Sequence, residues 1–332
     1  MTSSPLLSRS SLGKTGPSVA RLALGCMGMS GMYGAADERE SIATIHAALE
    51  RGVNLLDTGD FYGMGHNELL IGRALAGRRQ DAILSVKFGA QRGPGGTWLG
   101  VDTRPAAIRT FLAYSLTRLG TDYIDVYRPA RLDPNVPIEE TMGTLADLVK
   151  EGHIRGIGLS EVGADTIRRA HAVHPVTDLQ IEYSLISRAP EQKIFPVLRE
   201  LGMGVTAYGV LSRGLLSGSK PTGAGDFRQY LPRFAGEAGA HNQKLVQALG
   251  ELAKARGLTT SQLAIAWVVA KGSNIVPVLG ARTLKQLDES LGALTRELSP
   301  EDVAAIERLV EGAGVQGERY EPAQMQHLDS ER

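Results

Sequence analysis

The 332-residue sequence lacks several features, and each absence excludes a class of protein. Its one cysteine, Cys26, cannot form an internal disulfide, and no cysteine–histidine spacing predicts a metal site, so we expect no metal and a reducing cytoplasm. Basic and acidic residues balance at 36 each, which argues against binding to nucleic acid or an anionic membrane. No apolar run reaches the roughly 18 residues of a membrane span, and residues 1–11 lack the apolar stretch of a secretory signal. Nothing in the sequence indicates an oligomeric state.

What the sequence does contain is an alternation of short apolar runs with helical patterns. Buried parallel strands are nearly continuous apolar runs, and eight segments have this character. These are Arg21–Leu24, Val53–Asp57, Ala82–Lys87, Tyr123–Tyr127, Ile154–Ser160, Asp178–Ile181, Gly204–Tyr208 and Ile275–Leu279. Between them, apolar side chains recur at helical spacing, most clearly over Asp37–Arg51, Thr103–Leu119 and Ile138–Lys150.

Eight strands separated by helices predict a (β/α)8 barrel, with an open doubly wound sheet as the alternative. We expect one domain over residues 1–332, with its core at about residues 12–309. Leu7–Ser10 and Val19–Ala20 predict a hairpin that could close the bottom of the barrel, and Pro300–Val310 predicts an added C-terminal helix. Residues 89–101 and 209–241 are expected to be irregular loops over the active rim, and the segment from Gly312 onward is expected to be a tail.

Three polar residues follow the ends of neighbouring predicted strands. Asp57 and Lys87 each close an apolar run, and Tyr62 lies five residues after Asp57. In parallel α/β folds these strand ends meet at one rim, where active sites form. A phenol beside an ammonium that is held by a carboxylate makes a proton donor, because the cation stabilises the phenolate and lowers a pKa that is otherwise about 10.

At this point the chain resembles the aldo-keto reductases, particularly the bacterial branch related to potassium-channel β-subunits. The resemblance runs from about Leu12 to Leu309, and its motifs are Leu24–Met29, Asp57–Thr58, Tyr62–Gly63, Asn67–Glu68, Lys87, Gly120–Asp125, Gly156–Glu161 and Val276–Arg282. It implies a barrel that binds NADPH without a Rossmann domain and transfers hydride to an aldehyde or ketone. It also implies that Tyr62 is the general acid, assisted by Lys87 and Asp57.

The resemblance also implies a cofactor site along the same rim. Ser160 and Gln180 match positions that bond the nicotinamide carboxamide, and Tyr208 matches the aromatic residue that stacks on the ring. The pyrophosphate loop corresponds to Gly209, Val210, Leu211 and Arg213, although Gly209–Val210 stand where relatives usually have Ser-Pro. The adenosine end corresponds to Gly280, Arg282, Gln286, Glu289 and Ser290, with Ser290 in place of the usual Asn. An arginine near the ribose favours a 2′-phosphate, hence NADPH over NADH.

The largest departure from the family pattern is Ala130, which stands where a catalytic histidine is usual. None of the seven histidines is near this predicted strand in the sequence. Three interpretations remain: Tyr62 and Lys87 work with a water, Arg128 or Arg131 supplies a second donor, or turnover is lost. The last would leave an NADPH-binding sensor or interaction subunit resembling the channel β-subunits. The carbonyl substrate is expected above the barrel, against Tyr33, Tyr62, Trp98, Ala130 and Arg131.

Overall fold

The computed structural model describes residues 7–31, 34, 36–219, 221, 227–326 and 328–332. In this part of the chain, eight parallel strands form one sheet in the spatial order β8-β5-β4-β3-β12-β11-β10-β9. They are β3 (Ala23–Gly25), β4 (Leu55–Gly59), β5 (Ile83–Phe88), β8 (Val126–Pro129), β9 (Gly158–Ser160), β10 (Asp178–Glu182), β11 (Gly204–Tyr208) and β12 (Ile275–Gly280). Two parallel bridges, Ile124 to Ile154 and Tyr127 to Ile157, join the edge strands. The predicted (β/α)8 barrel is confirmed, and all eight predicted strands correspond to observed ones.

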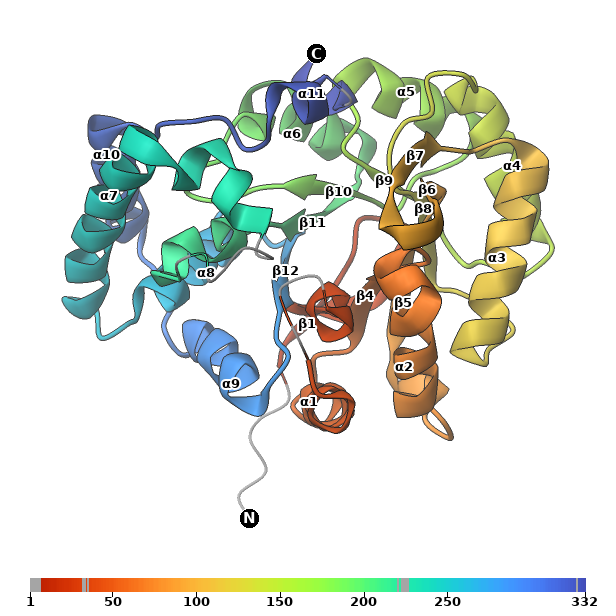
Figure 1. The fold of residues 1–332 in the computed structure, drawn as a ribbon, viewed down its shortest axis with the longest axis horizontal. Coiled ribbons are helices and arrows are strands. Elements are labelled where there is room, and N and C mark those ends of the chain that lie inside the picture. Colours follow the sequence, from red (N-terminus) through yellow and green to blue (C-terminus); the bar gives the residue numbers. More distant parts are fainter. Residues whose placement is uncertain (1–6, 32–33, 35, 220, 222–226, 327) are drawn as a thin grey trace.

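Helices surround this sheet on its outer side (Figure 1). In chain order they are α1 (Glu38–Glu50), α2 (His66–Ala74), α3 (Pro105–Leu119), α4 (Ile138–Lys150), α5 (Ala164–Val173), α6 (Pro190–Leu201), α7 (Gly236–Lys254), α8 (Thr260–Ala270), α9 (Leu284–Gly292), α10 (Pro300–Ala313) and α11 (Pro322–Met325). The predicted C-terminal helix is α10, which begins at Pro300 after a Ser299 capping box. In the described residues, no helix has the length and apolar character to cross a membrane.

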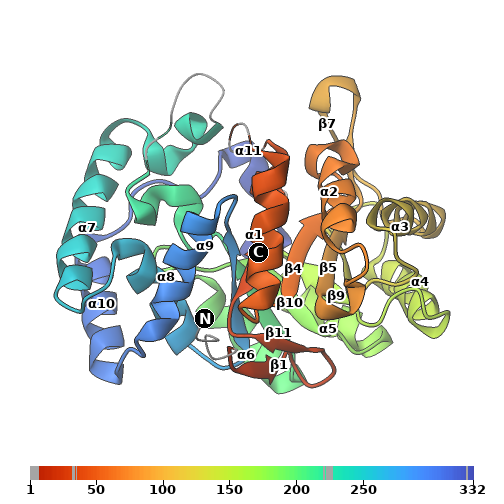
Figure 2. The ribbon, with the colours of Figure 1, turned by 90° about the horizontal axis from the view of Figure 1, so that it is seen from below.

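A hairpin closes the amino-terminal end of the barrel, as predicted. Its strands, β1 (Arg9–Ser11) and β2 (Ser18–Ala20), pair antiparallel. Leu12 in the turn and Val19 in β2 join a small buried cluster with Leu55 and Val276, which come from barrel strands on either side of β3. Figure 2 shows this hairpin and β7 (Trp98–Val101) at opposite ends of the molecule. The rim at which the sequence predicts the active site is therefore the end to which β7 belongs.

Two segments expected to be irregular contain regular structure. Residues 89–101 fold into a hairpin of β6 (Ala90–Arg92) and β7, with a register shift that accommodates the glycine-rich turn. In the described part of residues 209–241 there are 3-10 turns at Ser212–Ser217, Phe227–Tyr230 and Pro232–Phe234, and α7 begins at Gly236. Their high glycine content concealed these elements, because glycine has little intrinsic preference for either helix or strand.

The expected C-terminal tail is a further correction. Gly312 lies inside α10, and the residues after Ala313 return across the carboxyl end of the barrel. Asp329 accepts a hydrogen bond from the backbone N–H of Gly163 at 2.8 Å, and the buried Arg319 side chain pairs with Glu161. The periodicity of the sequence could not predict the position of this segment, because its contacts are polar and join residues far apart in the sequence.

Candidate active site

The carboxyl ends of β4 and β5 bring Asp57 and Lys87 together. Register pairing places Asp57 opposite Ser85 and Gly59 opposite Lys87, so side chains on the same face of the two strands meet inside the barrel. The Lys87 ammonium lies 2.5 Å from Asp57 Oδ1, and both side chains are buried. The hydroxyl of Ser85 donates to the second carboxylate oxygen at 2.9 Å. The carboxylate therefore fixes the ammonium in one position.

Gln180, on β10, completes this network from the opposite wall of the barrel. Its side-chain oxygen accepts from Lys87 Nζ at 2.9 Å, and its nitrogen donates to Asp57 Oδ2 at 2.7 Å. Gln180 is buried and both ends of its amide are engaged. The predicted cofactor residue and the predicted catalytic pair thus form a single connected unit.

Tyr62 begins a short 3-10 turn after β4 and lies over Lys87. The ammonium of Lys87 is 5.4 Å from the centroid of the Tyr62 ring, within the range of a cation–π contact. Asn67 ties the loop to the barrel, because its side chain accepts from Thr58 at 2.6 Å and donates to the Cys26 carbonyl at 2.8 Å. The structure therefore brings the three predicted catalytic residues, Asp57, Tyr62 and Lys87, to one point of the rim.

Burial shifts the pKa values of two groups in this part of the rim. Burial lowers the pKa of Lys87 and the nearby Arg128 charge adds to this effect, while Asp57 opposes it. Asp60, two residues before Tyr62, behaves in the opposite sense: burial and the Glu68 charge raise its pKa to about 7, against a hydrogen bond from the Gly89 backbone. A buried amine with a lowered pKa and a carboxyl that titrates near neutrality are typical of functional sites.

Position 130, where the family usually has a histidine, carries an alanine and so has no side-chain proton donor. Ala130 follows β8, is buried, and donates its backbone N–H to the Phe88 carbonyl at 2.8 Å. Arg128 does not reach the rim, because its fully buried guanidinium is paired with Asp178 at 2.9 Å and donates to Ser85 at 3.0 Å. Arg131 does lie at the rim, with Nη1 at 2.7 Å from the Ala130 carbonyl and 3.5 Å from Ser160 Oγ.

The predicted nicotinamide and pyrophosphate residues lie on neighbouring strand ends. Ser160 ends β9, Gln180 lies on β10, and Tyr208 ends β11, in adjacent positions of the sheet. The predicted pyrophosphate loop begins directly after Tyr208, with Gly209, Val210 and Leu211. The backbone at the next two residues, Ser212 and Arg213, is left-handed, with φ of 44° and 55°. The Ser212 hydroxyl is buried and has no hydrogen-bond partner among the described residues.

The predicted adenosine residues divide into two groups. Gly280, Arg282 and Gln286 lie together at the end of β12 and the start of α9, where Gln286 Oε1 accepts from the Arg282 backbone N–H at 2.8 Å. Glu289 lies further along α9, where it accepts a hydrogen bond of 2.5 Å from the Thr259 hydroxyl, which caps α8. Ser290 is buried in the same helix.

Of the predicted substrate-facing aromatics, Trp98 lies on β7 and is 48% exposed, with the Arg92 guanidinium 5.2 Å from its ring centroid. Tyr33 lies outside the described residues. Among those that are described, no group of three His, Cys, Asp or Glu side chains is placed to hold a metal ion.

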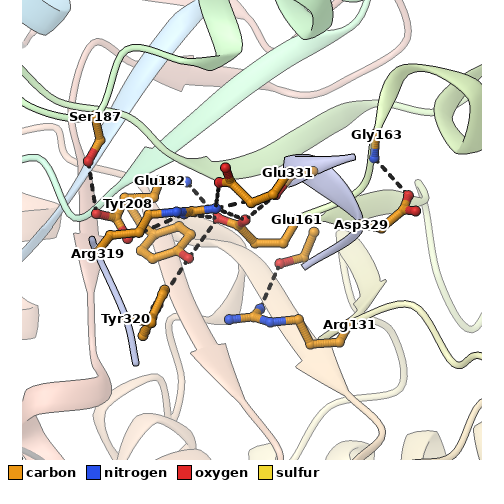
Figure 3. Close-up of polar contacts among 12 residues, drawn as sticks. Arg131, Glu161, Gly163, Glu182, Ser187, Tyr208, Arg319, Tyr320, Asp329 and Glu331 are labelled. Atoms are coloured by element: carbon orange, nitrogen blue, oxygen red, sulfur yellow. Dashed lines mark hydrogen bonds and ion pairs between the residues drawn. The ribbon is translucent and has the colours of Figure 1, made fainter. Parts of the chain in front are cut away.

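Sequence reasoning missed a cluster of charged and aromatic residues beside the cofactor positions. Figure 3 shows Arg319 among Glu161, Glu182 and Glu331, with Tyr320 next to Tyr208. The Tyr208 hydroxyl donates to Glu161 at 2.7 Å and lies 3.3 Å from that of Tyr320. Burial raises the pKa of Glu161, but hydrogen bonds and charge from Arg319 lower it to about 2. Glu161 and Glu182 could have been found from the sequence, because each is an acidic residue at the end of a predicted strand. No sequence pattern pointed to Arg319.

Comparison with known proteins identifies the family of this chain and supports its fold. Residues 21–311 match the aldo/keto reductase family. The chain belongs to the aldo-keto reductase family. It is 41% identical over 318 residues to a protein from Glycine max named probable aldo-keto reductase 1, covering 93% of this chain and 90% of that one. The resemblance found in the sequence is thereby confirmed.

Solved structures of aldo-keto reductases have the same architecture as this chain. A glycerol dehydrogenase from Gluconobacter oxydans superposes with a TM-score of 0.83 at 30% identity, covering 92% of this chain and 95% of that chain. An aldo-keto reductase from Bacillus halodurans, in its holo form, gives a TM-score of 0.78 at 29% identity, covering 95% and 100%. As an aldo-keto reductase, the protein is an oxidoreductase built on a (β/α)8 barrel.

Proposed function

We propose that this aldo-keto reductase uses NADPH to reduce a small aldehyde or ketone to an alcohol in the cytoplasm. The observation that carries the proposal is the position of Lys87, which is held by Asp57 and lies under the Tyr62 ring. Hydride addition to a carbonyl carbon leaves negative charge on the oxygen, so a proton donor is needed there. Tyr62 has the chemistry of that donor, and Lys87 stabilises the phenolate that remains.

The residues of the rim fit a dinucleotide. The Ser212 hydroxyl, without a partner among the described residues, and the left-handed backbone at Ser212 and Arg213 form a loop that suits an anion. Ser160 and Tyr208 lie at strand ends beside it, and Arg282 lies at the far end, where its charge favours a 2′-phosphate. When bound, NADPH supplies the hydride. These positions support NADPH as the cofactor, with the phosphates along residues 209–213 and the adenosine at Gly280, Arg282, Gln286 and Glu289.

Arg131 takes over the missing histidine's role of orienting the carbonyl oxygen in this proposal. Arg128 is locked in a buried ion pair, whereas Arg131 extends from the residue after Ala130 toward Ser160. A guanidinium donates hydrogen bonds at every pH at which the protein is folded and so needs no tautomer to be set. The substrate then lies between Tyr62, Arg131 and the wall formed by Trp98.

Steady-state turnover of NADPH with a panel of aldehydes and ketones tests the proposal. If the protein is a carbonyl reductase, it should consume NADPH in proportion to the alcohol formed. The kcat/KM of its best substrate should lie well above the mean of the panel. A second candidate function is that of an NADPH-binding sensor. Ala130 favours it, because alanine lacks the hydrogen-bond donor of the histidine that is usual in the family at this position. Tight NADPH binding with negligible turnover on every carbonyl would support the sensor and contradict the reductase.

A further inference from the structure

Three arginines converge on one buried carboxylate beside the cofactor positions. Glu182, the last residue of β10, is fully buried, and its carboxylate pairs with Arg213 at 2.9 Å, Arg319 at 3.4 Å and Arg233 at 3.8 Å. The hydroxyl of Ser187 donates to it at 3.1 Å. A single negative charge here has more cationic partners than it needs, so one of them can leave without stranding it.

Arg213 is the partner with another proposed role. It lies in the loop assigned to the pyrophosphate, yet its guanidinium points at Glu182 and lies 4.3 Å from the Tyr320 ring centroid. Both terminal nitrogens of Arg213 face this carboxylate, at 3.5 Å and 2.9 Å, so a phosphate bound by them competes with Glu182. Breaking a buried ion pair is costly because it leaves an uncompensated charge behind. The transfer is inexpensive only if another cation stays on Glu182.

Arg319 is the better placed of the two cations that remain, because it lies 3.4 Å from the Glu182 carboxylate whereas Arg233 lies 3.8 Å from it. Arg319 comes from the C-terminal segment, which the sequence did not predict to be structured. Its side chain is 7% exposed, donates to Glu161 at 2.8 Å and 3.1 Å, and pairs with Glu331 at 2.5 Å. The segment is also fastened at Glu161, where the Ser330 hydroxyl donates to that carboxylate at 2.6 Å. Arg319 is therefore fixed by two more carboxylates besides Glu182.

We propose that Arg319 is a positioning residue for cofactor binding: it neutralises Glu182 so that Arg213 is released to the pyrophosphate. This inference rests on the proposed use of NADPH. In this inference Arg319 does not bind phosphate itself, and its effect on the cofactor passes through Glu182 and Arg213 alone.

Fluorescence titration of NADPH onto the purified protein tests this charge exchange. Arg213→Gln and Arg319→Gln should each raise the Kd by about tenfold or more, the scale of one lost hydrogen bond to a charged group. Glu182→Gln should lower the Kd, because Arg213 is no longer held back. In the Glu182→Gln background, Arg319→Gln should then have little effect. Glu331→Gln is the matched control, since Glu331 also pairs with Arg319 but lies outside the set of groups that hold Arg213.

The double variant separates charge exchange from simple loss of structure. If Arg319→Gln only detaches the C-terminal segment, it weakens NADPH binding equally in the wild-type and in the Glu182→Gln background, and the inference is overturned. An unchanged Kd in Arg319→Gln overturns it as well. If Arg319→Gln does not fold, Glu182→Gln decides alone: tighter NADPH binding supports the inference, and unchanged or weaker binding overturns it.

The outcome for the wild-type protein distinguishes the two proposals. A wild-type protein that binds neither NADPH nor NADH overturns the proposed function, and this inference with it. If the wild-type protein binds NADPH and the Arg319 and Glu182 variants bind it with the same Kd, only the inference is overturned. Limited proteolysis of the ligand-free variants provides a readout that is independent of cofactor. The bonds to Asp329 and Ser330 should keep residues 314–332 protected in Glu331→Gln.

Discussion

The ammonium nitrogen of Lys87 lies 5.4 Å from the centroid of the Tyr62 ring. This distance joins Tyr62, which follows β4, to Lys87, which lies near the carboxyl end of the neighbouring strand β5. Asp57 Oδ1 lies 2.5 Å from the same nitrogen and holds it in place. In the proposed mechanism, this fixed ammonium stabilises the negative charge that develops on the phenol oxygen of Tyr62 as it donates a proton.

Removing the Tyr62 hydroxyl should abolish most of the turnover. We expect Tyr62→Phe to lower kcat by about 10²-fold or more, the usual scale for a lost general acid, with the NADPH Kd nearly unchanged. The control is Tyr114→Phe, which removes the same hydroxyl from an exposed residue on α3. Steady-state kinetics and a cofactor titration measure both effects. A Tyr62→Phe protein that keeps most of its kcat would show that another group donates the proton.

Arg282 should distinguish the two nicotinamide cofactors. Arg282→Ala should weaken NADPH binding by about 1.5–3 kcal/mol, as expected for a lost hydrogen bond to a charged group. NADH has no 2′-phosphate, so its binding should change little. Arg78→Ala removes the same charge from the connection between α2 and β5, at the opposite end of the barrel, and serves as the control. Equal weakening for both cofactors would contradict the assignment of Arg282.

Restoring a histidine at position 130 tests what replaces it. Because Arg131 is proposed to orient the carbonyl oxygen, we expect Arg131→Met to lower kcat/KM for a small aldehyde such as 4-nitrobenzaldehyde, since one preorganised hydrogen bond contributes up to about 2.7–4 kcal/mol in catalysis. Ala130→His should bring no gain, because the role is already filled. The measurement compares Ala130→His with Ala130→Ser, which adds a shorter polar group. A higher kcat/KM in Ala130→His, in a variant that folds and binds NADPH, would mean that Arg131 does not fill the role.

Asp60 should make stability depend on pH. Its pKa is raised from 3.8 to about 7 in the folded protein, so between these values the native state holds a proton that the unfolded state has released. Stability therefore falls as pH rises through this window and levels off above it. Asp60→Asn, which cannot ionise, should gain up to about 4 kcal/mol at pH 8, corresponding to about three pKa units. Denaturant unfolding at about pH 4 and pH 8 measures this, and the gain should vanish at the lower pH.

The sequence by itself determined the barrel, because apolar runs and helical periodicity depend on local spacing alone. It placed eight strands that overlap or adjoin the observed ones, and α4 at Ile138–Lys150, where the structure has it. It also singled out Asp57, Tyr62 and Lys87, because parallel strands place their carboxyl ends on one rim whatever the details of packing. Ala130 was equally visible as a departure from a known pattern.

Only the tertiary structure decided which charged side chains can meet a ligand. Arg128 and Arg131 are three positions apart, and the sequence gives no reason to distinguish them. In the structure, Arg128 is buried and pairs with Asp178, whereas Arg131 lies at the rim. The C-terminal segment is the stronger case. Its anchor, Arg319, meets Glu161 and Glu182 across 158 and 137 residues. No local pattern encodes such a contact, because a buried ion pair forms only where two segments distant in the sequence end at the same point in space.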